Sequence, residues 1–344
     1  MAREEEESVA SQSREAWLAE QIAYHSDLYY NQAKTEISDA DFDTLWDELK
    51  KLNPQHPQLQ RVGAEVDPGT VKVDHMFPMR SLNKGVSDED ITHFVKESSL
   101  ESTRFISQPK LDGSALSLEY RKGRLVRAAT RGNGNRGEDV TKNARKVENV
   151  PHTLGVEVDM HIRGEVVMKK SVFEEKYRNI SPNPRNLAAG ALRQKKADGK
   201  ADASDLVFLA YDAKFPNEAN RHPDSEAPPS DPYDSLILEW LSNTAGIEPA
   251  PWIVHDANAE EASIESLCQE TRVWSEKRES YAFEIDGLVF KVDDLEKRDL
   301  LGMTAHHPRW ALAWKFPPEE AISVLLDVVW QTGRTGTITP VARI

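Results

Sequence analysis

The feature that most restricts the fold of this chain is a β-hairpin in residues 115–130. Residues 115–120 form a strand-like run, residues 121–124 (Arg-Lys-Gly-Arg) have the composition of a turn, and residues 125–130 return antiparallel. An antiparallel pair excludes a parallel βαβ unit at this point of the chain. We therefore predict an antiparallel sheet here, with a strand at 104–106 leading into it.

Lys110 stands just before this hairpin, in the stretch 107–113 (Ser-Gln-Pro-Lys-Leu-Asp-Gly). We expect Asp112 and Gly113 to form a turn that places Lys110 at the mouth of the hairpin. A lysine acts as a nucleophile only when it is neutral, and desolvation or nearby positive charge lowers its pKa. The stretch is compatible with a tuned nucleophile and with an ordinary surface lysine, and alone it does not distinguish the two.

Residues 131–137 (Arg-Gly-Asn-Gly-Asn-Arg-Gly) match the spacing G-x-G-x-x-G, and we expect a helix to begin at Glu138. The dinucleotide-binding fingerprint requires parallel strands, whereas the preceding strand belongs to the hairpin, so we reject a Rossmann fold. A phosphate-binding loop and a plain surface loop both remain open. Arg131 would add positive charge to a phosphate-binding loop.

Length and composition indicate a globular protein of two or three domains. Of the 344 residues, 39% are hydrophobic and 29% are charged, which is ordinary for a soluble protein. Residues 1–7 lack the basic and apolar segments of a secretory signal, and no stretch is typical of a transmembrane helix, so we predict a cytoplasmic protein with no membrane partner. Cys268 is the only cysteine, which excludes an intrachain disulfide and a multi-cysteine zinc site within this chain, and we expect it to be buried on a helix. The net charge of −15 argues against a broad basic surface, although a local basic groove is compatible with it.

A helical hairpin is predicted at the N-terminus from apolar residues at helical spacing in residues 15–30 and 39–52. Tyr29, Tyr30, Asp39 and Asp43 cluster near the connection. Aromatic faces beside carboxylates suit a flat cationic ring such as oxidised nicotinamide. The alternative is a solvated helix start with core aromatics, and the pattern alone favours that alternative.

Charged residues interrupt several strand-like runs where charge is costly. They are Glu165 in 161–168, Glu284, Asp286 and Lys291 in 283–292, and Lys315 among the aromatic residues of 308–317. Period-two alternation places Glu284 and Asp286 on one face, with Lys291 on the other parity unless Gly287 bends the strand. Carboxylates with lysines suit a metal ion and a phosphate together, while structural salt bridges would explain each residue singly.

Further elements follow from periodicity and turn residues. We predict helices at 88–98, 187–194, 234–245 and 260–277, a buried strand at 206–211, and a hairpin of 322–330 with 337–341 around the turn 333–336. The prolines and glycine between residues 54 and 69 are typical of a linker.

Seven short motifs together resemble one enzyme family. Lys110-Leu111-Asp112-Gly113 is similar to the nucleophile motif of the covalent nucleotidyltransferases, the DNA and RNA ligases and capping enzymes. The other motifs narrow the resemblance to the bacterial NAD-dependent DNA ligases: Ala129-Thr130-Arg131-Gly132, Arg163-Gly164-Glu165, Asn183-Pro184-Arg185-Asn186, Ile285-Asp286-Gly287, Pro308-Arg309-Trp310-Ala311 and Lys315-Phe316-Pro317. Their order and spacing cover nearly the whole chain.

The resemblance implies an α+β architecture in three parts. Residues 1–66 would be a small helical domain that binds nicotinamide mononucleotide. Residues 67–317 would be a nucleotidyltransferase (adenylation) domain with a mixed or antiparallel sheet of the ATP-grasp-like ligase type. Residues 318–344 would be the incomplete beginning of an OB-fold domain, so we expect a truncated chain that retains self-adenylation and seals nicks weakly or not at all.

The resemblance also implies a reaction and a set of residues. Lys110 would attack the AMP phosphorus of NAD, release nicotinamide mononucleotide and carry AMP for transfer to the 5′-phosphate of nicked DNA in replication and repair. The implied catalytic residues are Lys110, Asp112 and Asp286. The implied nucleotide contacts are Tyr29, Tyr30, Asp39, Phe42, Asp43, Ser81, Leu82, Gln108, Leu111, Arg131, Glu165, Lys291 and Lys315. The implied ligands of Mg²⁺ or Mn²⁺ are Glu165, Glu284 and Asp286, with zinc expected only in a C-terminal region beyond this chain.

Two departures from the family pattern bear on affinity. Gln108 stands where the family usually has a glutamate facing the adenine, and Asn133 replaces the usual aspartate of the glycine-rich loop. An amide still offers an acceptor, so we expect activity and adenine recognition to survive. Two alternatives to a monomeric NAD-dependent ligase fragment are a catalytically silent NAD-binding module and an ATP- or GTP-using relative, the latter disfavoured by the N-terminal hairpin.

Overall fold

The structure is a computed structural model. It describes residues 14–28, 36–37, 39–60, 71–99, 103–194, 201–216, 227–229, 231–256, 259–304, 307–317, 323–332 and 338–343. Within these ranges no helix has the length and apolar character needed to cross a membrane.

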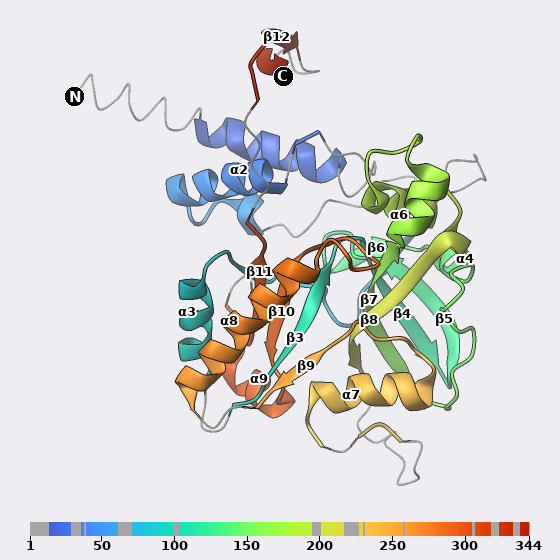
Figure 1. The fold of residues 1–344 in the computed structure, drawn as a ribbon. Helices are drawn as coiled ribbons and strands as arrows, with labels where there is room; N and C mark the ends of the chain where they lie inside the picture. The colour runs from blue at the N-terminus through green and yellow to red at the C-terminus, as the bar shows by residue number, and fades with distance from the viewer. Residues whose placement is uncertain are drawn as a thin grey trace.

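Two sheets lie side by side in the main body of the molecule (Figure 1). The first has five strands in the order β2 (Asn83–Gly85), β11 (Ala311–Lys315), β10 (Ile285–Val292), β3 (Phe105–Leu111) and β9 (Ile253–His255). Its β2–β11 pair is parallel and the other pairs are antiparallel. The second sheet is entirely antiparallel, in the order β5 (Arg124–Thr130), β4 (Ser114–Arg121), β7 (Met160–Met168) and β8 (Leu206–Lys214).

Lys110 precedes the open end of the predicted hairpin, but its strand belongs to a different sheet. β4 and β5 do form the predicted hairpin, but β3, which carries Lys110, pairs with β10 and β9 in the other sheet. Asp112 and Gly113 therefore carry the chain from one sheet to the other. A Cβ atom on Gly113 would lie 2.3 Å from the carbonyl oxygen of Val166 in β7, so the crossing requires glycine.

The helix predicted to begin at Glu138 begins later, as α4 (Thr141–Ala144), because residues Arg136–Glu138 form strand β6. This strand pairs with β1 (Lys72–Asp74), which uses the backbone groups that a helix would need. The glycine-rich loop before it is closed by its own hydrogen bonds. The side-chain oxygen of Asn133 accepts the N–H groups of Asn135 and Arg136, at 3.1 and 2.9 Å. Asn133 thus shapes the loop, and an amide oxygen serves that role as a carboxylate would.

Helices cover the outer face of the five-stranded sheet and the ends of both sheets (Figure 1). They and the short helical turns are α3 (Asp88–Ser98), α4 (Thr141–Ala144), α5 (Lys170–Val172), η2 (Phe173–Tyr177), α6 (Pro184–Arg193), η3 (Ala203–Asp205), α7 (Asp234–Trp240), η5 (Leu241–Ala245), α8 (Glu260–Lys277) and α9 (Leu295–Leu301). The helices predicted at 88–98, 234–245 and 260–277 are confirmed. A capping box between Ser87 and Asp90 fixes the start of α3, and Asn183 caps α6. Cys268 is buried on α8, as predicted.

The N-terminal helical hairpin is confirmed as a helix over 14–28 and α2 (Asp39–Leu52), followed by η1 (Pro57–Gln60). Leu18, Ile22, Leu49 and Leu59 form its own small hydrophobic cluster. Two other hydrophobic clusters consist mainly of buried residues from the two sheets and from the helices that pack on them. At the C-terminal end, β12 (Asp327–Thr332) and β13 (Ile338–Arg343) form the predicted antiparallel ribbon, and the predicted turn between them lies outside the described residues.

Candidate active site

Lys110 and Asp286 form a bidentate ion pair where the two sheets meet. The Lys110 Nζ donates to both carboxylate oxygens of Asp286, at 2.7 and 2.6 Å. Their strands are adjacent, because Lys110 on β3 stands opposite Gly287 on β10. The side chains are 29% and 20% exposed, so the pair is enclosed yet open to a ligand.

The pKa of Lys110 moves against the direction expected of a nucleophile. Burial by itself lowers it, but Asp286, with smaller contributions from Asp112 and Glu165, overcomes burial and raises the pKa of Lys110 above its ordinary value. Lys110 is therefore an ammonium in this structure. The upward shift comes from the carboxylates near the amine, Asp286 foremost.

Asp112 belongs to the same group through Arg185. The guanidinium Nη1 of Arg185, on the first turn of α6, lies 2.7 Å from a carboxylate oxygen of Asp112. Burial lowers the pKa of Arg185 to about 10, with Asp286 opposing the shift. Arg185 was not among the predicted site residues, although its place in the Asn183–Asn186 motif was a signal that could have included it.

Glu165 projects from β7 toward the same group, across the boundary between the sheets. Burial raises its pKa to about 8; Lys110 and Arg131 oppose the shift, while Asp112 and Asp286 add to it. Tyr211 on β8 lies close enough that Glu165 also raises its pKa, after burial, to about 12. Nothing in the sequence pattern singled out Tyr211, which lies inside a run that reads only as a buried strand.

The predicted metal ligands Glu165, Glu284 and Asp286 are not assembled. The register of β10 shifts between Ile285 and Gly287, so period-two alternation fails at Asp286. Glu284 instead lies 3.8 Å from Lys170 and is 40% exposed, while both oxygens of Asp286 are bound to Lys110. Among the described residues no group of three or more His, Cys, Asp or Glu is arranged to hold a metal ion.

Gln108 and Lys291 lie deeper in the molecule along the boundary between the two sheets, which we call the seam. Gln108 is two residues before Lys110 on β3 and is 3% exposed, with its side-chain N–H donating over 3.5 Å to the carbonyl of Ala250. Lys291 on β10 donates to the Tyr211 carbonyl at 2.9 Å and pairs with Asp234 at 2.6 Å. Asp234, on the first turn of α7, was not predicted as a site residue.

Lys315 has an anionic partner, Asp43. Its Nζ donates to Asp43 on α2 at 2.8 Å, and Lys84 on β2 binds the other oxygen of the same carboxylate. Burial alone would raise the pKa of Asp43, but Lys84 and Lys315 together lower it below the ordinary value. The N-terminal hairpin thus contacts the larger body through one carboxylate between two lysines.

The remaining predicted contacts differ in where their side chains lie. Arg131 donates to the Ser81 hydroxyl at 2.8 Å, and Leu82 beside it is half-buried. Leu111 packs in the hydrophobic core beneath β3, on the opposite face from Lys110, so its side chain does not join the group. Phe42 packs against Trp46 within the N-terminal hairpin.

Three of the predicted contacts carry no structural information. Tyr29 and Tyr30 lie outside the described residues, and the side chain of Asp39 does too. Their role stays a prediction.

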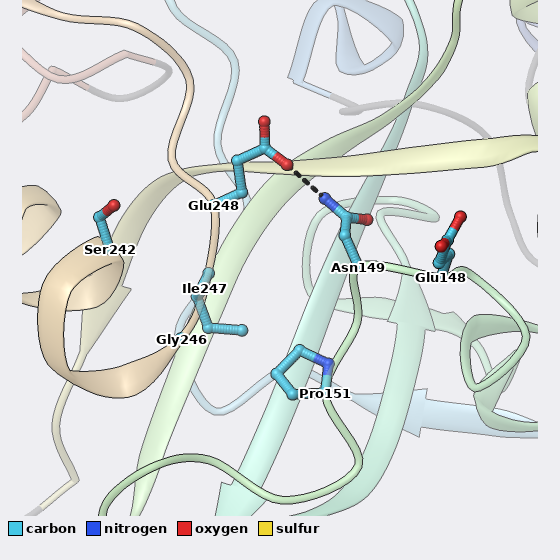
Figure 2. Close-up of a pocket in the computed structure, with 7 residues that line it drawn as sticks. All are labelled: Glu148, Asn149, Pro151, Ser242, Gly246, Ile247 and Glu248. Atoms are coloured by element: carbon cyan, nitrogen blue, oxygen red, sulfur yellow. Dashed lines mark hydrogen bonds between the residues drawn. The ribbon is translucent and has the colours of Figure 1, made fainter.

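A separate cavity of about 410 Å³ lies away from this group (Figure 2). It is bounded by Glu148, Asn149, Pro151, Ser242, Gly246, Ile247 and Glu248. In it Asn149 donates to Glu248 at 2.9 Å and also to the Phe208 carbonyl at 2.7 Å. None of the predicted site residues lines this cavity.

The residues around Lys110 combine a primary amine, carboxylates and guanidinium groups. Such a set can hold an anionic substrate beside an amine nucleophile and balance the charge that develops in acyl or phosphoryl transfer. The arrangement fits nucleotidyl transfer to Lys110.

Comparison with known proteins agrees with this chemistry. Residues 69–319 match the NAD-dependent DNA ligase adenylation domain, and residues 8–64 match the DNA ligase-like, N-terminal NAD+-binding domain. A DNA ligase of Aquifex aeolicus (strain VF5) is 36% identical over 351 residues, covering 95% of this chain and 46% of that protein. A DNA ligase of Rhodopseudomonas palustris (strain TIE-1) is 39% identical over 348 residues, covering 94% of this chain and 46% of that protein. The chain thus spans about half the length of the curated relatives it matches.

Among solved structures, an archaeal ATP-dependent RNA ligase in form 2 is 12% identical with a TM-score of 0.41, covering 71% of this chain and 49% of that chain. A TM-score this low does not establish a common fold. The two family matches together cover most of the chain, and they confirm the resemblance drawn from its motifs. The chain therefore belongs to the NAD-dependent DNA ligase adenylation domain family and carries that family's N-terminal NAD+-binding domain.

Proposed function

We propose that Lys110 attacks the AMP phosphorus of NAD and becomes adenylated. The bond from Lys110 Nζ to phosphorus forms, the phosphorus–oxygen bond to nicotinamide mononucleotide breaks, and the amine loses a proton. The observation that carries this proposal is the ion pair of Lys110 with both oxygens of Asp286, in a group that also contains Glu165, Asp112 and Arg185. A fixed, partly exposed lysine at a strand end is aimed as a nucleophile must be.

Asp286 has two roles in this proposal. It orients Lys110, and it is the acceptor for the proton that must leave before attack, since both oxygens already accept hydrogen bonds from the amine. Both side chains are partly exposed, so the proton has a path to solvent. Arg185, beside Asp112, then balances negative charge as the phosphorus is attacked.

Glu165 acts as a ribose contact rather than as a charged ligand. With its pKa raised to about 8 by burial, it carries a proton near neutral pH and both donates and accepts hydrogen bonds. A ribose hydroxyl offers the matching donor and acceptor. Gln108, Lys291 and Tyr211, deeper along the seam, are the proposed surroundings of the base.

The N-terminal hairpin holds the nicotinamide half of NAD. Tyr29, Tyr30, Asp39, Phe42 and Asp43 are the proposed contacts, since aromatic and acidic side chains attract a cationic ring. The match to an N-terminal NAD+-binding domain supports this assignment. The division into domains at residues 1–66, 67–317 and 318–344, with the last part beginning an OB fold, belongs to the same proposal.

A divalent metal ion is expected for the family, but the arrangement of the predicted ligands does not fit a metal ion. Asp286 is bound to Lys110, Glu165 is protonated near neutrality, and Glu284 lies with Lys170. We therefore derive no step through a metal ion. The requirement for Mg²⁺ or Mn²⁺ stays a prediction, tested by adding a chelator to the reaction below.

In the complete enzyme, AMP would pass from Lys110 to the 5′-phosphate of nicked double-stranded DNA, serving replication and repair. Because this chain spans about half of its curated relatives, that activity is proposed for the longer protein. A zinc site outside residues 1–344, a cytoplasmic location and a monomeric state are predictions of the same kind.

The test is the intact mass of the protein after incubation with NAD and Mg²⁺. We expect one added AMP, no adduct with ATP in place of NAD, and no adduct for Lys110→Ala. Lys96→Ala, which removes an exposed lysine on α3, is the matched control and should react as the native chain does. Absence of an adduct from the native chain under all these conditions would refute the proposal.

A catalytically silent NAD-binding module is the second candidate, favoured by one observation. The raised pKa of Lys110 keeps the amine protonated in this structure. Calorimetry that finds stoichiometric NAD binding, together with no release of nicotinamide mononucleotide, would select this alternative.

A further inference from the structure

Two lysines from neighbouring strands converge on one carboxylate of the N-terminal hairpin. Lys315 Nζ lies 2.8 Å from one oxygen of Asp43, and Lys84 binds the other oxygen. The Asp43 and Lys315 side chains are 23% and 18% exposed, and Lys84 is 45% exposed. A carboxylate held this way by two ammonium groups marks a site for a small anion.

The two lysines share a sheet face with Lys110. Lys110 and Lys315 both stand opposite Gly287, on either side of β10. Lys84 on β2 stands opposite Ala313, which is two residues from Lys315 on β11. Paired residues, and residues two apart on a strand, project from the same face, so Lys110, Lys315 and Lys84 form a row across the sheet.

The order of the lysines along the row matches the order of the two phosphates in a dinucleotide. Adjacent strands are about 4.8 Å apart, so Lys315 is about two strand spacings from Lys110 and Lys84 is one further. Lysine side chains are long enough to converge on neighbouring phosphate groups from these positions. If Lys110 meets the AMP phosphorus, the next anion along the row is the second phosphate of the pyrophosphate.

We propose that Lys84 and Lys315 form a two-lysine site for the second phosphate of NAD, and that Asp43 occupies this site when the dinucleotide is absent. Binding of NAD then exchanges the Asp43 carboxylate for phosphate oxygens. The exchange leaves Asp43 free to face the cationic nicotinamide ring. This inference rests on the proposed function, because that function sets the AMP phosphorus at Lys110.

Lys84 is the new element in this proposal. It was not among the predicted site residues, and it binds the same carboxylate as Lys315. The Lys84 ammonium adds a second positive charge beside Lys315. Removal of this ammonium should therefore weaken the binding of a ligand that carries the second phosphate. The binding of a ligand without the second phosphate should be unaffected.

The experiment measures binding by calorimetry in a Lys110→Ala background, where no covalent step occurs. NAD and AMP are titrated separately at one low ionic strength. We expect Lys84→Ala to weaken NAD binding about 5- to 10-fold and to leave AMP binding unchanged, a loss of the size of one partly exposed charge-assisted contact. Lys84→Arg should retain most of the affinity, and Lys96→Ala should match the parent.

A second pair of variants separates a phosphate contact from a purely structural clasp. If Lys84 only holds Asp43, then Asp43→Asn should remove any further effect of Lys84→Ala on NAD. If Lys84 binds phosphate, Lys84→Ala should still weaken the binding of NAD in the Asp43→Asn background. Equal NAD affinities with and without Lys84 in that background, or an equal loss for AMP, would overturn the inference.

This outcome is independent of the test of the proposed function. A native chain that forms no AMP adduct refutes the role of Lys110 whatever the calorimetry gives. A native chain that forms the adduct, combined with unchanged NAD binding in Lys84→Ala, refutes the two-lysine site alone.

Discussion

Two lysine–aspartate ion pairs lie along the boundary between the two sheets, and the lysine pKa shifts in opposite directions in the two pairs. Lys110 lies 2.6 Å from Asp286, and Lys291 lies 2.6 Å from Asp234. The first pair is 29% and 20% exposed, whereas the second is 8% and 1% exposed. The pKa of Lys110 is raised, while burial, opposed by Asp234, lowers the pKa of Lys291 to about 8.

The surrounding charges explain the difference. Asp286, with smaller contributions from Asp112 and Glu165, raises the pKa of Lys110 by more than burial lowers it. Asp234 is shared between Lys291 and Arg298, which lies 2.8 Å away, and Lys214 adds a further positive charge. Two ion pairs of the same length can therefore shift the lysine pKa in opposite directions, depending on the neighbouring charges and on exposure to solvent.

The largest expected effect is on stability, from Asp234→Asn. Removal of this carboxylate leaves Lys291 and Arg298 as buried charges without compensation, and one of its own oxygens already lacks a hydrogen bond. We expect a loss of about 3–5 kcal/mol in the free energy of unfolding, measured by denaturant titration. Asp286→Asn is the matched control, with an expected loss of about 1 kcal/mol or less. Equal losses would contradict the distinction between the two pairs.

The next effect is on the rate of adduct formation, from Asp286→Asn. The amide no longer accepts the proton or fixes Lys110 with two charged hydrogen bonds. We expect the rate at saturating NAD to fall roughly 100-fold, the lower end for loss of a positioned acid–base group. Quenched time points analysed by mass spectrometry measure it. A rate within a factor of three of the native chain would remove Asp286 from the proposed chemistry.

A smaller effect concerns pH, through Glu165. Its pKa is raised from 4.5 to about 8, mainly by burial, so between these values the folded protein holds a proton that the unfolded chain has released. Native stability should therefore fall as pH rises through that window. Glu165→Gln has no titrating group at this position, so its stability should not show this part of the decrease with pH. Thermal unfolding of both proteins from pH 5 to pH 8 tests the sign, and parallel curves would count against a protonated Glu165.

The smallest effect is expected from Lys214→Met. Burial, with Arg163 and Arg298, lowers the pKa of Lys214 to about 8, so its charged form is unfavourable in the folded state. At pH 7 the substitution should leave stability unchanged or raise it by up to about 1 kcal/mol. The gain should fade as pH rises above 8, because native Lys214 then loses its proton while folded. Denaturant midpoints at pH 7 and pH 9.5 measure the difference, and a clear loss of stability at pH 7 would show that Lys214 is needed as a cation.

Local patterns predicted the elements of this chain well. The helix at Glu260–Lys277 and the start of α3 at Ser87 follow from apolar spacing and capping residues, which act within a few residues. The hairpin of β4 and β5 follows from its turn composition. The motifs predicted that Lys110, Glu165 and Asp286 lie near one another, because those residue types and their order are characteristic of one family. They did not predict that Glu284 lies elsewhere or that Arg185 joins the group.

The sequence by itself determined the nucleophile candidate, its family and most secondary structure, because these depend on short-range preferences and on motif order. Only the tertiary structure decided that Lys110 lies between two sheets, that a register shift separates Asp286 from Glu284, and that Asp43 bridges Lys84 and Lys315. It also decided the direction of each pKa shift. Those outcomes depend on which strands pair and on which charges meet across the chain, and no local pattern encodes either.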